Sequence, residues 1–210
     1  QQQRVALARA LVIEPSVLLL DEPLANLDAS LRDDMRFFIR DLQRRVGITT
    51  IYVTHDQSEA LVMSDRIVVM NRGVIEQCGT PRDIYERPRS LMVAGFIGQS
   101  NTLAGHVLTR EGEAYVIETP EGLLRAHGAP GLGADVRVMI RPENIRTIPG
   151  DNTLAGRLVK STYLGASCLI EIETAAGTRI TTHAPADSTL APGDDVTLGF
   201  AAARAWAFAA

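Results

Sequence analysis

Apolar residues along the first 96 positions alternate between helical stripes and short continuous runs. A stripe at helical spacing occupies residues 5–12 and ends before Pro15, which lacks the N–H that a helix interior needs. Residues 17–20 (VLLL) form an apolar run of strand length, a pattern typical of a strand buried on both faces of a parallel sheet. Helices that alternate with such strands predict an α/β arrangement.

The next elements continue this alternation. Asp28 can cap a long amphipathic helix that runs up to Gly47, a residue suited to a helix C-terminus. Residues 48–54 (ITTIYVT) are rich in β-branched side chains and predict a second strand, which ends at His55. A strand, a helix and a strand in this order predict a right-handed crossover between parallel neighbours.

A hairpin and a short helix are predicted at the end of this region. Two apolar runs, 66–70 and 74–78, flank the tripeptide Asn71-Arg72-Gly73, and its glycine can supply the positive φ that a tight turn needs. Residues 80–83 (TPRD) combine a capping threonine, a proline at the first helical position and an acid in the first turn. This combination predicts the start of a short helix.

From about residue 100 the helical periods disappear, and Gly and Pro interrupt short apolar runs. This pattern of short apolar runs interrupted by Gly and Pro predicts a small β-barrel or sandwich. The sequence NTLAG at 101–105 recurs at 152–156, and each copy leads into an apolar run. The copies also share a Gly-x-Asp-Val element before a later strand, at 133–136 and 193–196. We therefore expect two similar β units, at about 99–150 and 151–210.

Composition narrows the classes of partner and compartment. The 210 residues are 46% hydrophobic, enough for one large or two small cores. The formal net charge of −4 and the absence of like-charge blocks indicate neither nucleic-acid binding nor an anionic-membrane anchor. The sequence contains no run of about 18 apolar residues, so no membrane-spanning helix is predicted. Cys78 and Cys168 lie far apart in sequence, so we expect free thiols in a soluble, cytosolic chain.

Two carboxylates follow the first predicted strand directly. The first acid of such a pair, Asp21, can hold Mg²⁺, usually through water, and the second, Glu22, can orient the water that attacks a γ-phosphate. Taken alone, an apolar run followed by Asp-Glu is more often a plain helix or turn start than a catalytic pair. The neighbouring residues decide between the two interpretations.

His55 ends the next predicted strand. Adjacent parallel strands deliver their C-terminal residues to the same sheet edge, so His55 is expected near Asp21 and Glu22. A catalytic-triad fragment or a metal site is an alternative, but neither a Gly-x-Ser-x-Gly elbow nor a second nearby histidine supports it. The remaining histidines lie in the β region and are expected to be structural: His106, His127 and His183.

Four motifs in order carry a family resemblance. They are QQQRVALARA at 1–10, LLLDEP at 18–23, ANLD at 25–28 and VTHDQSEAL at 53–61. In this order and spacing the sequence resembles the ATP-binding subunits of ABC importers. The four segments then correspond to the end of the signature motif, Walker B, the D-loop and the switch-histidine region.

The resemblance implies a role for each matched residue, with ATP and Mg²⁺ as cofactors. Gln1 would end the signature motif, which faces the nucleotide held by the opposite subunit. Asp21 would be the Mg²⁺-associated acid, and Glu22 would be the general base or water-orienting residue. Asp28 would be the D-loop acid at the dimer seam, and His55 would contact the γ-phosphate.

The family also has parts that these 210 residues do not contain. A Gly-rich loop ending in Lys-Ser/Thr, an adenine-stacking aromatic before it, a Q-loop and the Leu-Ser-Gly-Gly that would precede Gln1 are absent. We interpret the chain as lacking its N-terminal Walker A part. Such a loop cradles the phosphates, so we expect the chain alone neither to bind ATP tightly nor to hydrolyse it. We also expect exposed apolar faces around residues 17–20 unless a partner covers them.

The β region resembles the TOBE domain that follows the ATPase domain in importers of maltose, polyamine, iron and sulfate. The resemblance lies in FIGQSN at 96–101, IRPENI at 140–145 and YLG at 163–165. It implies OB-like barrels that contribute to dimerisation and regulation. We therefore assign residues 1–98 to the C-terminal part of a P-loop NTPase (ABC) nucleotide-binding domain and 99–210 to an all-β TOBE-like domain.

Two details of the β region complete the prediction. Arg141 and Glu143 are expected to form a surface ion pair, in preference to a ligand contact. The tail at 205–208 (AWAF) is expected to be a closing strand that buries its aromatic side chains.

Taken together, the sequence predicts the energising subunit of an importer. It would act as a homodimer, bound to membrane permease subunits at the cytoplasmic face of the membrane, without nucleic acid and without inserting into the membrane itself. YERP at 85–88 and FIGQSN at 96–101 are closest to polyamine-type members. The alternatives are a non-catalytic dimerisation or sensor module and, against the TOBE resemblance, a soluble ABC ATPase acting on DNA or ribosomes.

Overall fold

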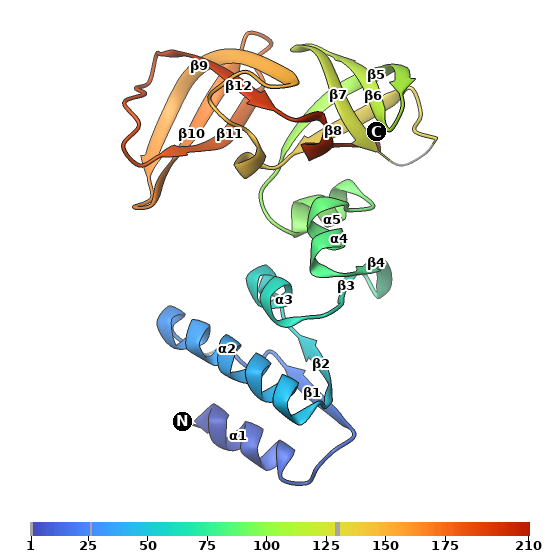
Figure 1. The fold of residues 1–210 in the computed structure, drawn as a ribbon, viewed down its shortest axis with the longest axis vertical. Coiled ribbons are helices and arrows are strands. Elements are labelled where there is room, and N and C mark those ends of the chain that lie inside the picture. Colours follow the sequence, from blue (N-terminus) through green and yellow to red (C-terminus); the bar gives the residue numbers. More distant parts are fainter. Residues whose placement is uncertain (1, 26, 129–130) are drawn as a thin grey trace. The chain divides into compact units, whose positions relative to one another are not determined.

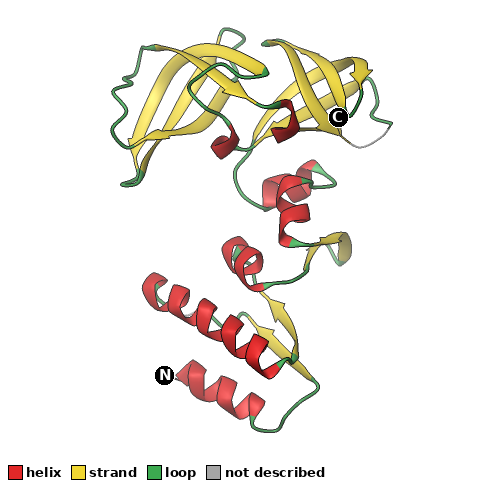
Figure 2. Cartoon of the chain, in the orientation of Figure 1, coloured by secondary structure: helices red, strands yellow, loops and turns green. Residues whose placement is uncertain are grey.

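The structure is a computed structural model that describes residues 2–25, 27–128 and 131–210, with the side chains of residues 2–4, 29 and 30 also outside the description. The chain forms two compact units, Gln1–Tyr85 and Glu86–Ala210. Figure 2 shows helices in the first unit and mainly strands in the second. Among the described helices, none has the length and apolar character that a membrane crossing requires.

The first unit alternates helices with short strands, as predicted. Its elements are α1 Gln2–Leu11, β1 Val17–Asp21, α2 Ala29–Val46, β2 Thr49–Val53, α3 Gln57–Met63, β3 Ile67–Asn71 and β4 Val74–Gly79, followed by α4 Pro81–Glu86 at the boundary of the two units (Figure 1). Strands β1 and β2 pair in parallel, with Val17 opposite Thr49 and Asp21 opposite Val53. The predicted α/β arrangement with parallel neighbours is confirmed.

Local signals fix the ends of these elements. The carboxylate of Asp28 accepts a hydrogen bond from the backbone N–H of Leu31 at 2.9 Å, so it caps α2 as predicted. Gly47 ends α2 with a φ of 67°, and its N–H donates to the carbonyl of Gln43. At the predicted hairpin, β3 and β4 pair antiparallel, and Gly73 in the turn has a φ of 81°.

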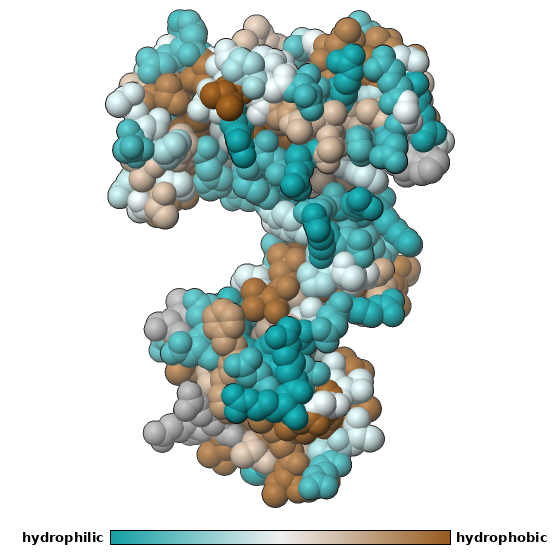
Figure 3. Space-filling model, in the orientation of Figure 1, coloured by the Kyte–Doolittle hydropathy of each residue, from teal (hydrophilic) through white to brown (hydrophobic). Residues whose placement is uncertain are grey.

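The core of the first unit lies on one face of the β1–β2 pair. Side chains from α1, α2, α3 and the strands pack there: Leu7, Leu18, Leu24, Met35, Ile39, Ile48 and Met63. On the opposite face of the pair, Val17, Leu19, Ile51 and Val53 are 43%, 70%, 54% and 51% exposed. The prediction of a strand buried on both faces is therefore wrong for this chain, because helices cover one face only. The predicted exposure of apolar side chains is confirmed, and Figure 3 shows apolar surface on this unit.

The second unit begins with α5 Leu91–Phe96 and is otherwise mainly β. Its strands are β5 Asn101–Glu111, β6 Ala114–Thr119, β7 Gly122–Gly128, β8 Asp135–Ile140, β9 Asn152–Tyr163, β10 Ser167–Thr174, β11 Arg179–Pro185, β12 Asp195–Phe200 and β13 Ala205–Ala209. A closed barrel has the strand order β13-β7-β6-β5-β8, and a four-stranded sheet has the order β11-β10-β9-β12. The sequence-based expectation of small β units is thus met by a barrel and a sheet.

The two β units exchange segments at their ends. The C-terminal strand β13 pairs antiparallel with β8 and parallel with β7, so it closes the barrel formed by β5 to β8. In the other direction, Arg146, which follows β8, forms a bridge with Gly199 of β12 in the four-stranded sheet. The predicted closing strand is confirmed, but only one of its aromatic side chains is buried: Phe208 is 6% exposed, whereas Trp206 is half-buried. The barrel that it closes belongs to the first copy of the repeat, which residue spacing alone did not indicate.

The repeated asparagine of NTLAG has the same contact pattern in both copies. The amide of Asn101 donates to the carbonyl of Thr181 at 2.8 Å and accepts from its N–H at 2.7 Å. In the second copy, the amide of Asn152 donates to the carbonyl of Arg125 at 2.8 Å and accepts from its N–H at 2.6 Å. Each asparagine therefore extends the backbone pairing of the other β unit, which explains why the repeat retains it.

The repeated glycine that ends NTLAG also has a physical reason. A Cβ at Gly105 would lie 2.5 Å from the side chain of Ile117, and a Cβ at Gly156 would lie 2.6 Å from the carbonyl oxygen of Glu173. Neither separation is possible for a real side chain without movement of the neighbouring strand. Glycine lets β5 and β9 lie close to the strands with which they pair, β6 and β10.

Arg141 corrects the prediction of a surface ion pair. Arg141 is only 2% exposed. Its Nη1 donates to three backbone carbonyls, those of Ala94, Gly98 and Gln99, at 2.9, 3.1 and 3.0 Å. These carbonyls lie at the C-terminal end of α5 and just beyond it, where helical hydrogen bonds run out. Arg141 therefore fastens α5 to the end of β8, because the free carbonyls need a buried donor.

We expect replacement of Asn152 by Ala to destabilise the second unit by about 1–3 kcal/mol, because the N–H and C=O of Arg125 would lose their partners. Urea unfolding of the 210-residue chain measures this loss. The exposed Thr153, the next residue in the repeat, provides the matched control as Thr153→Ala. Equal losses in the two variants would contradict a role for the amide.

Candidate functional site

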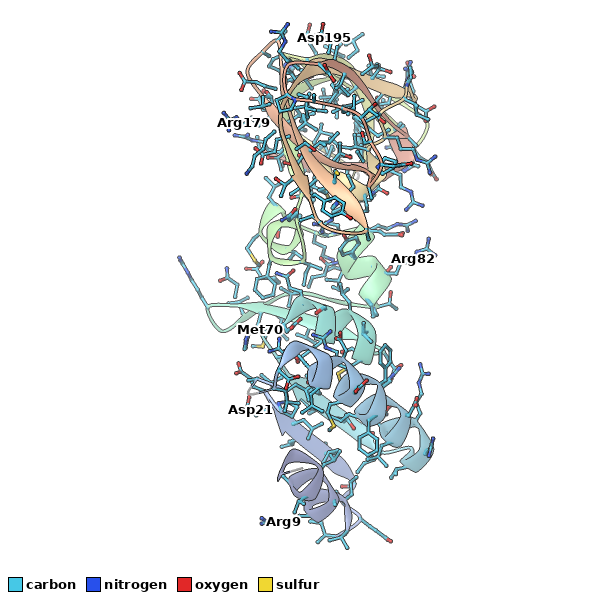
Figure 4. All side chains as sticks on the ribbon, turned by 90° about the vertical axis from the view of Figure 1, so that its left-hand side faces the viewer. Arg9, Asp21, Met70, Arg82, Arg179 and Asp195 are labelled. Atoms are coloured by element: carbon cyan, nitrogen blue, oxygen red, sulfur yellow. The ribbon has the colours of Figure 1, made fainter. Side chains whose placement is uncertain are left out.

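The predicted site lies where β1 and β2 end. Because the two strands are parallel neighbours, Asp21 and Glu22 leave the sheet at the same edge as His55. The backbone N–H of Glu22 donates to the carbonyl of Val53 at 2.9 Å and so continues the strand pairing by one residue. Glu22 has a φ of 44°, a left-handed conformation that is uncommon outside glycine. Figure 4 marks Asp21 at the end of the β1 ribbon.

Glu22 and His55 are in direct contact. Nδ1 of His55 lies 2.9 Å from Oε1 of Glu22, a hydrogen-bond distance. A carboxylate can only accept, so Nδ1 carries the proton and the other ring nitrogen, Nε2, remains available. The side chains of His55 and Glu22 are 73% and 45% exposed. The structure thus brings together two of the predicted site residues, at a place that water and a ligand can reach.

The contact changes the protonation of the imidazole. The hydrogen bond to Glu22, and then the negative charge of the same carboxylate, raise the pKa of His55 above its ordinary value of 6.5. The raised pKa favours the imidazolium, in which both ring nitrogens are donors. Such a side chain can hold Glu22 with Nδ1 and present Nε2 to an anionic group.

A pocket opens beside this pair. Residues from the end of β1, the start of α2, the end of β2 and α3 line it: Glu22, Ala25, Arg32, Thr54, His55, Asp56 and Glu59. The lining is mostly charged and polar, so the pocket suits a small polar or anionic group better than an apolar one.

A buried carboxylate supports the loop that carries His55. Glu59, in the first turn of α3, is 3% exposed, and its Oε2 accepts from the hydroxyl of Tyr52 at 2.9 Å and from that of Thr54 at 2.7 Å. The hydroxyl oxygen of Thr54 in turn accepts from the backbone N–H of Asp56 at 2.9 Å. Burial, then the hydrogen bond to Glu59, raises the pKa of Tyr52, so its hydroxyl remains a donor.

Two arginines of α2 reach the same loop. Nη2 of Arg36 donates to Oδ2 of Asp56 at 3.0 Å, and Nη1 of Arg32 lies 3.6 Å from the same oxygen. Asp56 also caps α3 by accepting from the N–H groups of Ser58 and Glu59 at 2.8 and 3.2 Å. Partial burial disfavours the charged form of Asp56, but the hydrogen bond from the Ser58 hydroxyl, those from the N–H groups of Glu59 and Ser58, and the charge of Arg36 outweigh it. The pKa of Asp56 is therefore lowered.

The remaining predicted residues lie at separate places. Asp21 is exposed at the end of β1, where its carboxylate faces water. Asp28 is exposed and occupied as the cap of α2. Gln1 lies outside the described residues. Asp21 directly precedes Glu22 in the chain, and Asp28 lies at the N-terminus of α2.

The carboxylates fit the chemistry of Mg²⁺ bound together with phosphate. Within residues 2–25, 27–128 and 131–210, no group of three or more His, Cys, Asp or Glu side chains could hold a metal by itself. Mg²⁺ does not need such a cage, since it keeps several waters and uses one or two carboxylates plus phosphate oxygens. A single exposed carboxylate, that of Asp21, meets this requirement.

Sequence reasoning missed Glu59, Arg36, Arg32 and Tyr52 as parts of this site. One signal was available for Glu59, because Asp56 and Glu59 have the spacing of a helix cap followed by an acid in the first turn. That spacing predicts where α3 begins. It does not predict that Glu59 turns back toward β2, which depends on how α3 packs.

Comparison with known proteins finds relatives that are similar to nearly the whole chain. A family model of the TOBE domain matches residues 138–208. The "Fe(3+) ions import ATP-binding protein FbpC" of Rhizobium etli is 48% identical over 201 residues, which cover 95% of this chain and 57% of that protein. The "Spermidine/putrescine import ATP-binding protein PotA" of Rubrobacter xylanophilus is 47% identical over 209 residues, with 95% and 55% covered. A solved structure of the cytoplasmic molybdate-binding protein ModG has a TM-score of 0.47, is 18% identical, and covers 52% of this chain and 96% of its own.

Over 95% of its length, the chain is similar to ATP-binding subunits of iron and polyamine importers. Part of its β region, residues 138–208, matches the TOBE domain. The predicted fold class, an ABC-type α/β part followed by an all-β, OB-like TOBE domain, is confirmed. The chain spans little more than half the length of the curated relatives that it matches.

We expect Glu22→Gln to lower the pKa of His55, because the amide still accepts a hydrogen bond but the negative charge is gone. The raised pKa also makes the pair stabilising below pH ~6.5, the unfolded value, and this contribution disappears as the pH rises through the folded pKa. An NMR titration of the imidazole signals measures the shift. Glu76→Gln, the same chemical change in β4, is the control. An unchanged His55 in Glu22→Gln would show that the contact does not exist in solution.

Proposed function

We propose that this chain carries the hydrolytic edge and the TOBE domain of an ATP-hydrolysing subunit that energises solute import. One observation carries the proposal. Glu22 and His55, at the ends of adjacent parallel strands, are joined by a 2.9 Å hydrogen bond, and the exposed Asp21 directly precedes Glu22 in the chain. The similarity to import ATP-binding proteins supports ATP hydrolysis as the reaction, and this cluster contains side chains suited to it.

Each side chain has a task that its geometry supports. Glu22 orients and activates the water that attacks the terminal phosphate, because its carboxylate reaches solvent and is held by His55. His55, with its Nδ1 on Glu22 and its pKa raised, presents Nε2 as a donor to the γ-phosphate oxygens. Asp21 would hold Mg²⁺ through water, and the bound ion would neutralise charge on the β and γ phosphates.

The phosphate cradle is the part of this chemistry that the 210 residues do not supply. They contain no Gly-x-x-x-x-Gly-Lys-Ser/Thr sequence, whose backbone N–H groups and lysine hold the β and γ phosphates. The 210-residue chain by itself is therefore proposed to be inactive. Hydrolysis is assigned to the full-length gene product.

Assembly follows from the roles of the family's motifs. The proposed assembly is a homodimer in which each subunit completes the site of the other. Gln1 is proposed to face the nucleotide held by the opposite subunit, and Asp28 is proposed to lie at the seam between the subunits. The dimer acts at the cytoplasmic face of the membrane by contact with permease subunits. The TOBE domain contributes to dimerisation and regulation.

The transported solute is proposed to be a polyamine. YERP at 85–88 and FIGQSN at 96–101 support this class. Relatives named for spermidine/putrescine import and for Fe(3+) import match the chain at 47% and 48% identity, so ferric iron is the solute against which the proposal is tested. Deletion of the gene is expected to abolish uptake of labelled spermidine and to leave ferric-iron uptake unchanged. Loss of iron uptake alone would assign the subunit to iron import instead.

The hydrolytic role is tested in the full-length gene product. We expect Glu22→Gln to lower kcat by about 10²–10⁴-fold while ATP binding persists, because only water activation is lost. Glu143→Gln, an exposed change in the TOBE domain, should leave kcat unchanged. A Glu22→Gln protein with undiminished kcat would remove Glu22 from the mechanism. Turnover by the 210-residue chain that Glu22→Gln abolishes would refute its proposed inactivity.

A further inference from the structure

His55 is exposed, yet both of its chain neighbours are tied to the interior. The hydroxyl of Thr54, the residue before His55, donates to the buried carboxylate of Glu59 at 2.7 Å. The backbone N–H of Asp56, the residue after it, donates to that same hydroxyl at 2.9 Å. The side chain of Asp56 accepts from Arg36 at 3.0 Å. The backbone on either side of the imidazole is thus fixed by hydrogen bonds that converge on Glu59 and Arg36.

We propose that Glu59 is a positioning residue for His55, which it holds against Glu22 through the hydroxyl of Thr54. Its importance for hydrolysis rests on the role proposed for His55 above. Its effect on the His55–Glu22 contact does not rest on that role.

The need for such a residue follows from exposure. The His55 side chain is 73% exposed and meets Glu22 through a single hydrogen bond, and a surface contact of this kind is weak by itself. Fixed direction at an exposed side chain must come from the backbone that carries it. Glu59 provides that rigidity, because it is 3% exposed and lies in the first turn of α3, which Asp56 caps.

Glu59 can hold this place because its charge is compensated. A buried carboxylate is costly unless it is paired and fully hydrogen-bonded. Oε2 of Glu59 accepts from the hydroxyls of Tyr52 and Thr54, and Oε1 lies 4.0 Å from Nη2 of Arg36. The side chain of Arg36 is itself only 12% exposed and also contacts Asp33 and Asp56.

The same network reaches the segment that contains Asp28. Nη2 of Arg32 donates to the carbonyl of Leu27 at 3.0 Å, and its Nη1 lies 3.6 Å from the Asp56 carboxylate. The loop before α2 and the loop that carries His55 are therefore connected through one guanidinium. This connection extends the positioning network from Glu59 to the start of α2.

The structure offers a matched pair of variants. Thr54→Val and Tyr52→Phe each remove one hydroxyl that donates to the same oxygen of Glu59, with little change in shape. Only Thr54 adjoins His55 and also accepts from Asp56. The pair therefore separates positioning of His55 from simple support of the Glu59 carboxylate.

The experiment is an NMR pH titration of the four histidines in the 210-residue chain, with the His55 signal assigned from a His55→Gln variant. We expect Thr54→Val to shift the pKa of His55 down toward ~6.5, as contact with Glu22 is lost, and to leave the other three histidines unchanged. Tyr52→Phe, and Thr54→Ser, which retains the hydroxyl, should leave His55 as in the parent chain.

Two results would overturn the proposal: a His55 pKa that Thr54→Val does not move, or one that Tyr52→Phe moves equally. Urea unfolding of each variant checks that the first unit is folded. If Thr54→Val does not fold, Thr54→Ala takes its place in the titration, with the same expected and contradicting results. In the full-length gene product, a fall in kcat of about tenfold or more with unchanged KM extends the positioning role to hydrolysis. A shifted His55 with unchanged kcat supports the positioning role and refutes the catalytic role proposed for His55.

Discussion

The register of the parallel pair β1–β2 is the constraint on which the site depends. Asp21 lies opposite Val53, and the N–H of Glu22 bonds to the carbonyl of Val53, so Glu22 and His55 leave the sheet together. A shift by one residue would turn every side chain to the other face and separate the pair. Leu18 opposes this shift. Its side chain is 5% exposed in the apolar core of the first unit, and a shifted register would expose it to water at a cost in free energy.

The sequence predicted what local chemistry and periodicity determine. The cap at Asp28, the end of α2 at Gly47, the hairpin at Gly73 and the meeting of Glu22 with His55 all follow from residue type and spacing. Contacts that depend on packing angles did not follow. Glu59 reaches Tyr52 and Thr54 because of how α3 lies on β2, and no periodicity encodes that angle.

The TOBE domain shows the same division between local and tertiary information. The repeat of NTLAG predicted two similar units, and the structure gives its asparagines one shared task, pairing with the backbone of the opposite unit. Which barrel β13 closes could not be predicted, because a strand pattern states that a residue is in a strand and not which neighbour it pairs with. The burial of Arg141 has the same origin, since its three carbonyl partners lie more than 40 residues earlier in the chain.

The site separates groups that face water from groups that fix their direction. Glu22 and His55 are exposed, so neither charge carries a large desolvation cost, and both remain accessible to a phosphate or a water. Glu59 is buried and the side chain of Arg36 is only 12% exposed, so their contacts are strong and directional, but each needs the other to offset the loss of hydration. Thr54 connects the buried groups with the exposed ones through one hydroxyl, which donates to Glu59 and accepts from the backbone N–H of Asp56. A reactive imidazole on a strand end can therefore be both solvent-accessible and held in one direction, which exposure alone would not permit.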